Sequence, residues 1–218
     1  FFVDQFNQEY SRDIEPMRGG HGDAHYYQMV SYIRRYKGVR PAPGLSAPRT
    51  IAVPGDFSQW ARVAPEYLDD LGDTAHRDHP GYGEGMVYRN ASGRNDFDCL
   101  KVARDDKQVF FYARTRAPLT APEGSNWMVL LLNTDGRADT GWNGYDLIVN
   151  RHRPRPGVCS VERHSGEGWL WQAAGEARLE WGREELHLAV PRGLLQQSGR
   201  LALQLKWADN VPESGDIM

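Results

Sequence analysis

The spacing of hydrophobic residues changes near residue 40. Before it, apolar side chains recur at helical spacing, with Asp23 as a suitable N-cap and Gly38 as a stop signal. The apolar positions are Tyr26, Tyr27, Met29, Val30, Ile33 and Tyr36. Residues 1–3 predict a short strand upstream of this helix. The order strand, loop, helix predicts one βα unit, whose strand needs parallel neighbours.

Beyond residue 50 the pattern favours β-strands. Apolar and polar residues alternate over 97–104, a polar turn follows, and 109–115 predicts the return strand of a hairpin. Residues 127–133 form a nearly continuous apolar run, which is typical of a strand covered on both faces. Further strands are expected at 145–150, 158–163, 168–172, 176–181, 185–190 and 201–207, and a helical turn near 191–195. Short strands with frequent turn signals predict a mainly β fold, an antiparallel β-sandwich of jelly-roll type.

Three prolines fall between residues 40 and 50, and proline interrupts both helices and central strands. We therefore expect a βα segment over 1–39, a linker over 40–50 and the β-sandwich over 51–218.

Charge and composition narrow the function classes. The chain has 218 residues and a formal net charge of -3, and its basic residues form no block. A nucleic-acid or anionic-membrane partner therefore has no electrostatic support. The longest apolar run, Met128–Leu132, is too short to span a bilayer. The two cysteines, Cys99 and Cys159, are compatible with one disulfide or, as we prefer, with two buried thiols.

An acidic loop follows the apolar run. It contains Asp135 and Asp139, and Asp146 comes shortly after it, among several glycines and backbone carbonyls. Calcium takes six to eight such oxygen ligands, so these three carboxylates are the candidate metal site. The alternative is an Asp-rich turn in which the carboxylates accept hydrogen bonds from backbone N–H groups.

Four aromatic residues are candidates for ligand binding. Trp169 and Trp171 alternate along a predicted strand and should share one face, while Trp142 and Tyr145 flank the acidic loop. An exposed aromatic face is a stacking surface for a sugar ring. The alternative is that these residues belong to the core. Trp60 is expected to anchor the first strand to the core.

Other constellations have weaker signals. Glu9 and Glu15 follow the first predicted strand, where a barrel hydrolase would carry its catalytic carboxylates. His76, Asp78 and His79 lie in a long loop and are of metal-ligating type, although hydrogen bonds that tie the loop down are the preferred explanation. The sequence has no nucleophile-elbow or phosphate-loop motif.

Two resemblances follow from these residues. Residues 7–16, with the helix ending at 33–38, resemble the last βα unit of bacterial TIM-barrel glycoside hydrolases of the family-99-like group. Residues 51–60, 102–112 and 135–146 are similar to family 9 carbohydrate-binding modules and related DOMON-like sandwiches. This second resemblance implies a module appended to a secreted polysaccharide-degrading enzyme, often with bound calcium.

We therefore expect a noncatalytic carbohydrate-binding module of a secreted or periplasmic bacterial glycoside hydrolase, with a polysaccharide or oligosaccharide and the catalytic barrel of the same parent protein as partners. The alternative is a structural sandwich that packs on that barrel without binding glycan. A DOMON-type haem domain would need an axial pair such as Met86 and His164. The glycan itself cannot be deduced from the sequence.

Overall fold

The computed structural model describes residues 24–39, 41, 43–72, 77–80, 87–90, 92–195, 202–209 and 211. The chain divides into two compact units. One unit comprises residues 1–43 and 76–91, and the other comprises residues 44–75 and 92–218. The predicted carboxylates Glu9 and Glu15, and also His76 and Met86, lie outside the described residues.

The first unit contains a helix and a hairpin. Helix α1 spans Ala24–Lys37, as the helical spacing predicted, and Gly38 after it has a positive φ of 79°. Strands β2 (Arg77–Pro80) and β3 (Val87–Asn90) pair antiparallel. Asp78 and His79 both lie in β2. Among the described helices, none is long and apolar enough to cross a bilayer.

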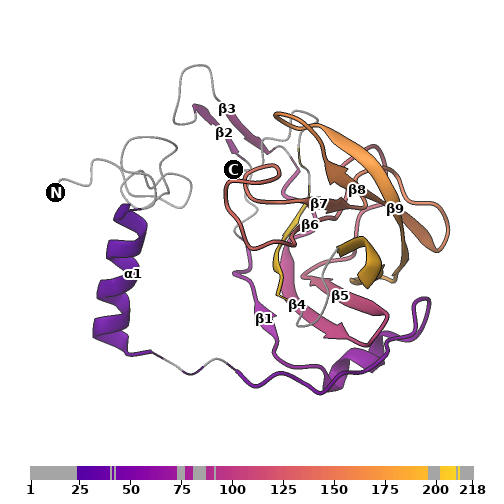
Figure 1. Ribbon diagram of the computed structural model, residues 1–218, viewed down its shortest axis with the longest axis horizontal. Coiled ribbons are helices and arrows are strands. Elements are labelled where there is room, and N and C mark those ends of the chain that lie inside the picture. Colours follow the sequence, from indigo (N-terminus) through magenta and orange to yellow (C-terminus); the bar gives the residue numbers. More distant parts are fainter. Residues whose placement is uncertain are drawn as a thin grey trace. The chain divides into compact units, whose positions relative to one another are not determined.

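The described residues of the second unit form nine antiparallel strands, so the predicted mainly β, antiparallel fold is confirmed. The strands join in one sheet in the order β1-β4-β5-β10-β9-β8-β7-β6-β11, which curls on itself (Figure 1). Their bounds are β1 Tyr67–Leu68, β4 Phe97–Arg104, β5 Gln108–Thr115, β6 Val129–Asn133, β7 Leu147–Val149, β8 Val158–His164, β9 Trp171–Trp181, β10 Glu185–Pro191 and β11 Gln204–Ala208. Two short 3-10 helices, η1 (Phe57–Arg62) and η2 (Arg192–Leu195), complete the unit.

The curl brings distant strands together around one core. Phe97 on β4 and Trp207 on β11 stand near opposite ends of the strand order, yet their ring centroids are 6.3 Å apart. The core between the two halves contains side chains from β5 through β11, including Phe111, Leu130 and Leu188. The two halves of the sheet therefore enclose a core as the two sheets of a sandwich do.

Two further clusters cover the outer faces of the curled sheet. Ile51, Val53, Trp60 and Val63, from the segment before β1, pack on the outer face of β4, β5 and β10. On the other half, the outer side chains of β6 and β7 pack beneath aromatic residues from two loops. Strands β6 and β7 are consequently buried along their whole length, which explains their unbroken apolar sequences.

Three local predictions change. Residues 168–172 and 176–181 were expected to form two strands, but β9 is one strand of 11 residues from Trp171 to Trp181. The expected entry strand around Trp60 is instead the helix η1, and Trp60 still anchors this segment because it is almost fully buried. Part of the predicted linker is hydrogen bonded to this unit, since Arg49 N donates to Arg104 O at 2.8 Å. Cys99 and Cys159 are both free and buried.

Candidate functional site

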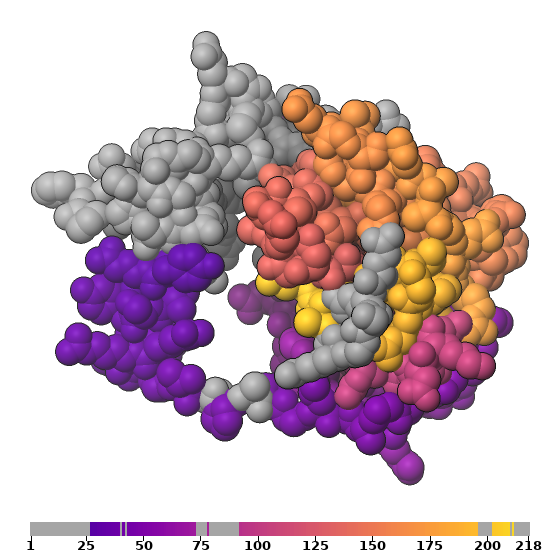
Figure 2. All heavy atoms as spheres, viewed as in Figure 1, coloured from indigo at the N-terminus to yellow at the C-terminus, as the bar shows by residue number. Residues whose placement is uncertain are grey.

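The four predicted aromatic residues come together in one cluster, called here the aromatic patch: Trp142, Tyr145, Trp169 and Trp171. All four are half-buried and pack over Val129, Leu131 and Ile148, the outer side chains of β6 and β7. Trp142 and Tyr145 come from the loop after β6, and Trp169 and Trp171 come from the β8–β9 turn. In Figure 2 the salmon-coloured loop lies beside the orange β8–β9 segment on the face in view.

A tight hairpin holds one half of the aromatic patch. Trp142 N donates to Tyr145 O at 2.8 Å, and Tyr145 N donates to Trp142 O at 2.9 Å. Between them Asn143 and Gly144 both have positive φ, 47° and 90°. An Asn-Gly pair suits this two-residue turn because both residues tolerate the left-handed region. The turn therefore fixes Trp142 and Tyr145 side by side.

Gly141 has no side chain, which allows its backbone to lie close to the backbone of Tyr145. Its φ is +64°, and a Cβ built on it would lie 2.2 Å from Tyr145 O. Any larger residue would have to displace the backbone that carries Tyr145. This glycine is thus part of the support of the aromatic patch.

The rings of the aromatic patch meet edge to face. The Trp142–Trp169 centroids are 4.7 Å apart at 79°, and the Trp169–Trp171 centroids are 5.2 Å apart at 83°. Trp169 precedes β9, so the predicted alternation of Trp169 and Trp171 along one strand is wrong, although both rings pack on the same outer face of the sheet. The two rings are perpendicular rather than coplanar.

Two indole nitrogens of the aromatic patch lack acceptors. Trp169 Nε1 and Trp171 Nε1 are buried and have no hydrogen-bond partner within the described part of the chain. An unsatisfied buried donor costs roughly 1–3 kcal/mol. Burial also raises the pKa of the Tyr145 phenol, which keeps this hydroxyl a neutral donor.

The three predicted metal ligands each have local partners. Asp139 pairs with Arg137 through two contacts of 3.0 and 2.9 Å, and Asp135 accepts from Arg137 N and from the Thr140 hydroxyl. Asp146 Oδ2 accepts from the Thr134 backbone N–H at 2.6 Å and from its hydroxyl at 2.9 Å. Over the described ranges, no three His, Cys, Asp or Glu side chains gather as a metal site would require.

This donor set does not fit Ca²⁺ as arranged, because the Arg137 guanidinium already neutralises Asp139 and the three carboxylates do not converge. The carboxylates instead tie down the loop that carries Trp142. The pairing with Arg137 lowers the pKa of Asp139, so the pair stays ionised over the physiological range. Calcium binding stays a prediction.

His164, the second residue of the haem alternative, serves a local role. Its Nε2 lies 2.8 Å from Gly168 O, and its ring packs edge-on against Trp171 at 5.2 Å. It thereby braces the β8–β9 turn beneath the aromatic patch. Its suggested partner Met86 lies outside the described residues.

A buried polar chain was missed by the sequence analysis. Trp60 Nε1 donates to His187 Nδ1 at 3.1 Å, and His187 Nε2 lies 3.1 Å from Glu180 Oε2. His187 is 0% exposed, and its burial lowers its pKa. The available signal was a histidine between Leu186 and Leu188, in a segment that is otherwise apolar from Leu186 to Pro191.

Comparison with protein-family models, with curated proteins and with solved structures found no match.

Proposed function

We propose that this chain is a noncatalytic carbohydrate-binding module whose binding surface is the aromatic patch. The observation that supports the proposal is the meeting of four half-buried aromatic side chains, brought from two separate loops onto one outer face of the sheet. Each of these rings keeps part of its surface in solvent, unlike the almost fully buried Trp60 and Trp127. Rings that keep part of their surface in solvent remain available to the apolar C–H face of a sugar.

Polar side chains on the same loop as Trp142 can supply hydrogen bonds to a bound sugar. Arg137, Asp139 and Asn143 are exposed on the loop that carries Trp142. Sugar hydroxyls need donors and acceptors around the stacking ring, and a guanidinium beside a carboxylate offers both. The arrangement supports the binding of a sugar rather than its chemical conversion.

Ring orientation narrows the form of the glycan. The Trp169 ring is turned by about 80° to the rings of both Trp142 and Trp171, so it cannot stack with either of them on one flat row of sugars. The patch therefore suits one sugar ring or a bent, short oligosaccharide better than the planar surface of a crystalline polysaccharide.

The test is binding of neutral oligosaccharides by isothermal titration and affinity electrophoresis. Trp142→Ala and Trp169→Ala should each weaken binding about tenfold or more, because a central aromatic anchor carries a large share of the binding free energy. Tyr67→Ala is the matched control: Tyr67 is a 49% exposed aromatic residue on β1, away from the patch.

Equal affinity in Trp142→Ala, Trp169→Ala and the native chain would contradict this proposal. Absence of binding to every glycan of a broad array would do the same.

A second candidate, a structural module that packs on a parent hydrolase barrel, is favoured by helix α1. Tyr32, Ile33 and Tyr36 are all exposed on this helix, and Tyr36 is 90% exposed. Such a stripe is typical of a helix that packs against another surface. Deleting residues 44–218 from the parent protein should then destabilise its barrel. An unchanged melting temperature would dismiss this candidate.

A further inference from the structure

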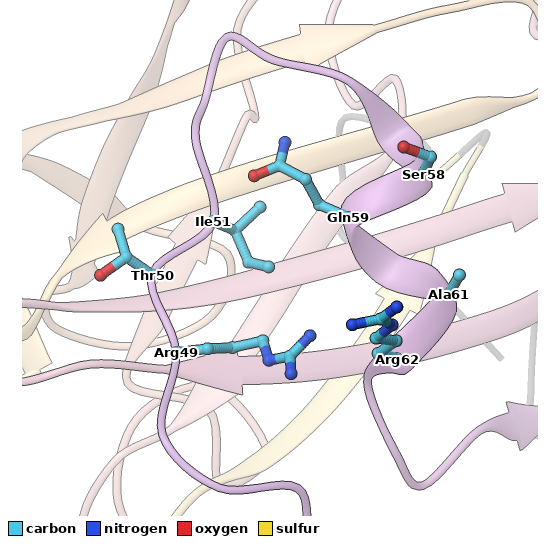
Figure 3. Close-up of a pocket in the computed structure, with 7 residues that line it drawn as sticks. All are labelled: Arg49, Thr50, Ile51, Ser58, Gln59, Ala61 and Arg62. Carbon is cyan, nitrogen blue, oxygen red and sulfur yellow. The ribbon is translucent and has the colours of Figure 1, made fainter.

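A hollow of about 460 Å³ opens between the segment 49–51 and helix η1. The hollow lies among the residues that cover the outer face of β4, β5 and β10, whereas the aromatic patch covers the outer face of β6 and β7. Its lining residues are Arg49, Thr50, Ile51, Ser58, Gln59, Ala61 and Arg62. Figure 3 shows the guanidinium of Arg49 extending across the hollow toward that of Arg62.

The lining is positively charged. Among the described residues that line the hollow, two are arginines and none is acidic. Two nearby carboxylates accept hydrogen bonds from lining residues: Asp105 from the Thr50 hydroxyl at 2.7 Å, and Asp56 from Ser58 N at 2.7 Å. Neither guanidinium forms an ion pair with a described residue. Two like charges that face each other repel, and a bound anion would relieve that repulsion.

Arg49 also carries an unsatisfied donor. Its Nε is buried and has no hydrogen-bond partner within the described part of the chain. Water does not reach this atom, so its desolvation is not offset by any acceptor. A guanidinium presents its donors in a planar fork that matches the spacing of two oxygens of a carboxylate, sulfate or phosphate.

The walls of the hollow are fixed by their own hydrogen bonds. Gln59 joins them, because its Oε1 accepts from Ala52 N at 2.9 Å while its Nε2 donates to Asp56 O at 2.7 Å. Beneath them Trp60 is buried and stacks on Tyr112 with centroids 5.1 Å apart. The two arginines therefore stand on a rigid frame, which lowers the entropic cost of holding a ligand.

We propose that Arg49 and Arg62 form a binding site for an oxyanion group, distinct from the aromatic patch. The ligand chemistry is a carboxylate, sulfate or phosphate held by two guanidinium groups. It can belong to a free inorganic anion or to an acidic sugar residue such as a uronate.

The experiment measures binding to the whole chain of sulfate, phosphate and glucuronate, with glucose as the neutral counterpart, at constant ionic strength set by chloride. An oxyanion at about ten times its Kd should raise the melting temperature of the native chain by about 3–5 °C. Arg62→Gln should lose this shift and weaken binding about tenfold, because Arg62 is exposed and its loss leaves the core intact. Arg49→Lys keeps the charge but removes the fork, and should also weaken binding.

Arg153→Gln is the matched control, since Arg153 is exposed on the β7–β8 loop. Sulfate stabilises many proteins by exclusion from their surface, so the comparison between variants decides the matter. Tighter binding of glucuronate than of the inorganic anions would support the site and assign it to an acidic sugar. Tighter binding of sulfate or phosphate would support it as a free-anion site. An equal shift in the native chain and in Arg62→Gln, or no shift with any oxyanion, would overturn the proposal.

Discussion

At the residue scale, a few backbone positions decide whether the aromatic patch can form. Gly141 has φ +64° and touches the Tyr145 backbone, whereas Gly136 in the same loop has φ +75° and open space around its Cα. Both positions favour glycine by conformation, but only Gly141 is also restricted by contact. Substituting each of these two glycines by alanine therefore distinguishes the cost of backbone strain from the cost of a steric overlap.

Gly136→Ala should destabilise the chain by about 1–2 kcal/mol, the usual cost of a left-handed alanine. Gly141→Ala should cost more than about 3 kcal/mol, because its Cβ would also overlap Tyr145 O. Urea denaturation followed by tryptophan fluorescence measures both variants. Equal losses would show that Gly141 gives the patch no steric support.

His187 gives the fold a dependence on pH. The Trp60 N–H donates to Nδ1, and an indole nitrogen can only donate, so the proton of neutral His187 is on Nε2, toward Glu180. Burial lowers the folded-state pKa despite the opposing effects of Glu180 and Glu185. Protonation would place an N–H against the N–H of Trp60.

Because the pKa of His187 is lower when folded than its unfolded value of about 6.5, the unfolded state binds the extra proton first. Stability should therefore fall as pH decreases below about 6.5, by at most about 1.4 kcal/mol per pH unit from this group. His187→Asn should flatten that slope, since its amide oxygen can still accept from Trp60. The same substitution at the exposed His152 is the control. If His187→Asn leaves the pH dependence of stability unchanged, that dependence does not come from His187.

At the element scale, β6 and β7 are the strands on which the proposed site depends. Leu130 and Leu132 face the central core, while Val129 and Leu131 face the aromatic patch. A strand of an ordinary β-sandwich would expose one of these two sets of side chains to solvent. Double coverage makes both faces of β6 sensitive to truncation.

Leu131→Ala should cost about 2–5 kcal/mol, as much as Leu130→Ala in the central core, because both side chains are fully buried. Leu131→Ala should in addition perturb the near-ultraviolet circular dichroism of the overlying tryptophans. Leu68→Ala, at a 74% exposed position on β1, should change stability by less than about 0.5 kcal/mol. A cost for Leu131→Ala as small as that of Leu68→Ala would show that the patch does not cover β6.

At the scale of the whole molecule, local sequence patterns predicted most strands of the large sheet but not β1, the β2–β3 hairpin or the assembly of the sheet. Alternation was sufficient for the β4–β5 hairpin, and the unbroken apolar run indicated the double coverage of β6. The single curled sheet depends on pairings between remote segments, such as β5 with β10, which periodicity does not encode. The break expected within β9 did not occur, since Gly175 lies inside a continuous strand.

The candidate site was predictable in part for the same reason. The aromatic residues were visible because they flank turn signals, and the curled sheet then brought their two loops together. Arg49 and Arg62 gave no such signal, since Arg49 lies in the predicted linker and Arg62 belongs to no motif or predicted strand. Their meeting depends on the packing of η1 against the sheet.

The most direct measurement of the central claim is a titration of the whole chain with neutral oligosaccharides, followed by the indole N–H resonances of its seven tryptophans. The proposal predicts progressive, saturable shifts for Trp142, Trp169 and Trp171, while the buried Trp60 and Trp127 stay unchanged. Saturation with unmoved patch resonances, or no shift with any glycan, would contradict it.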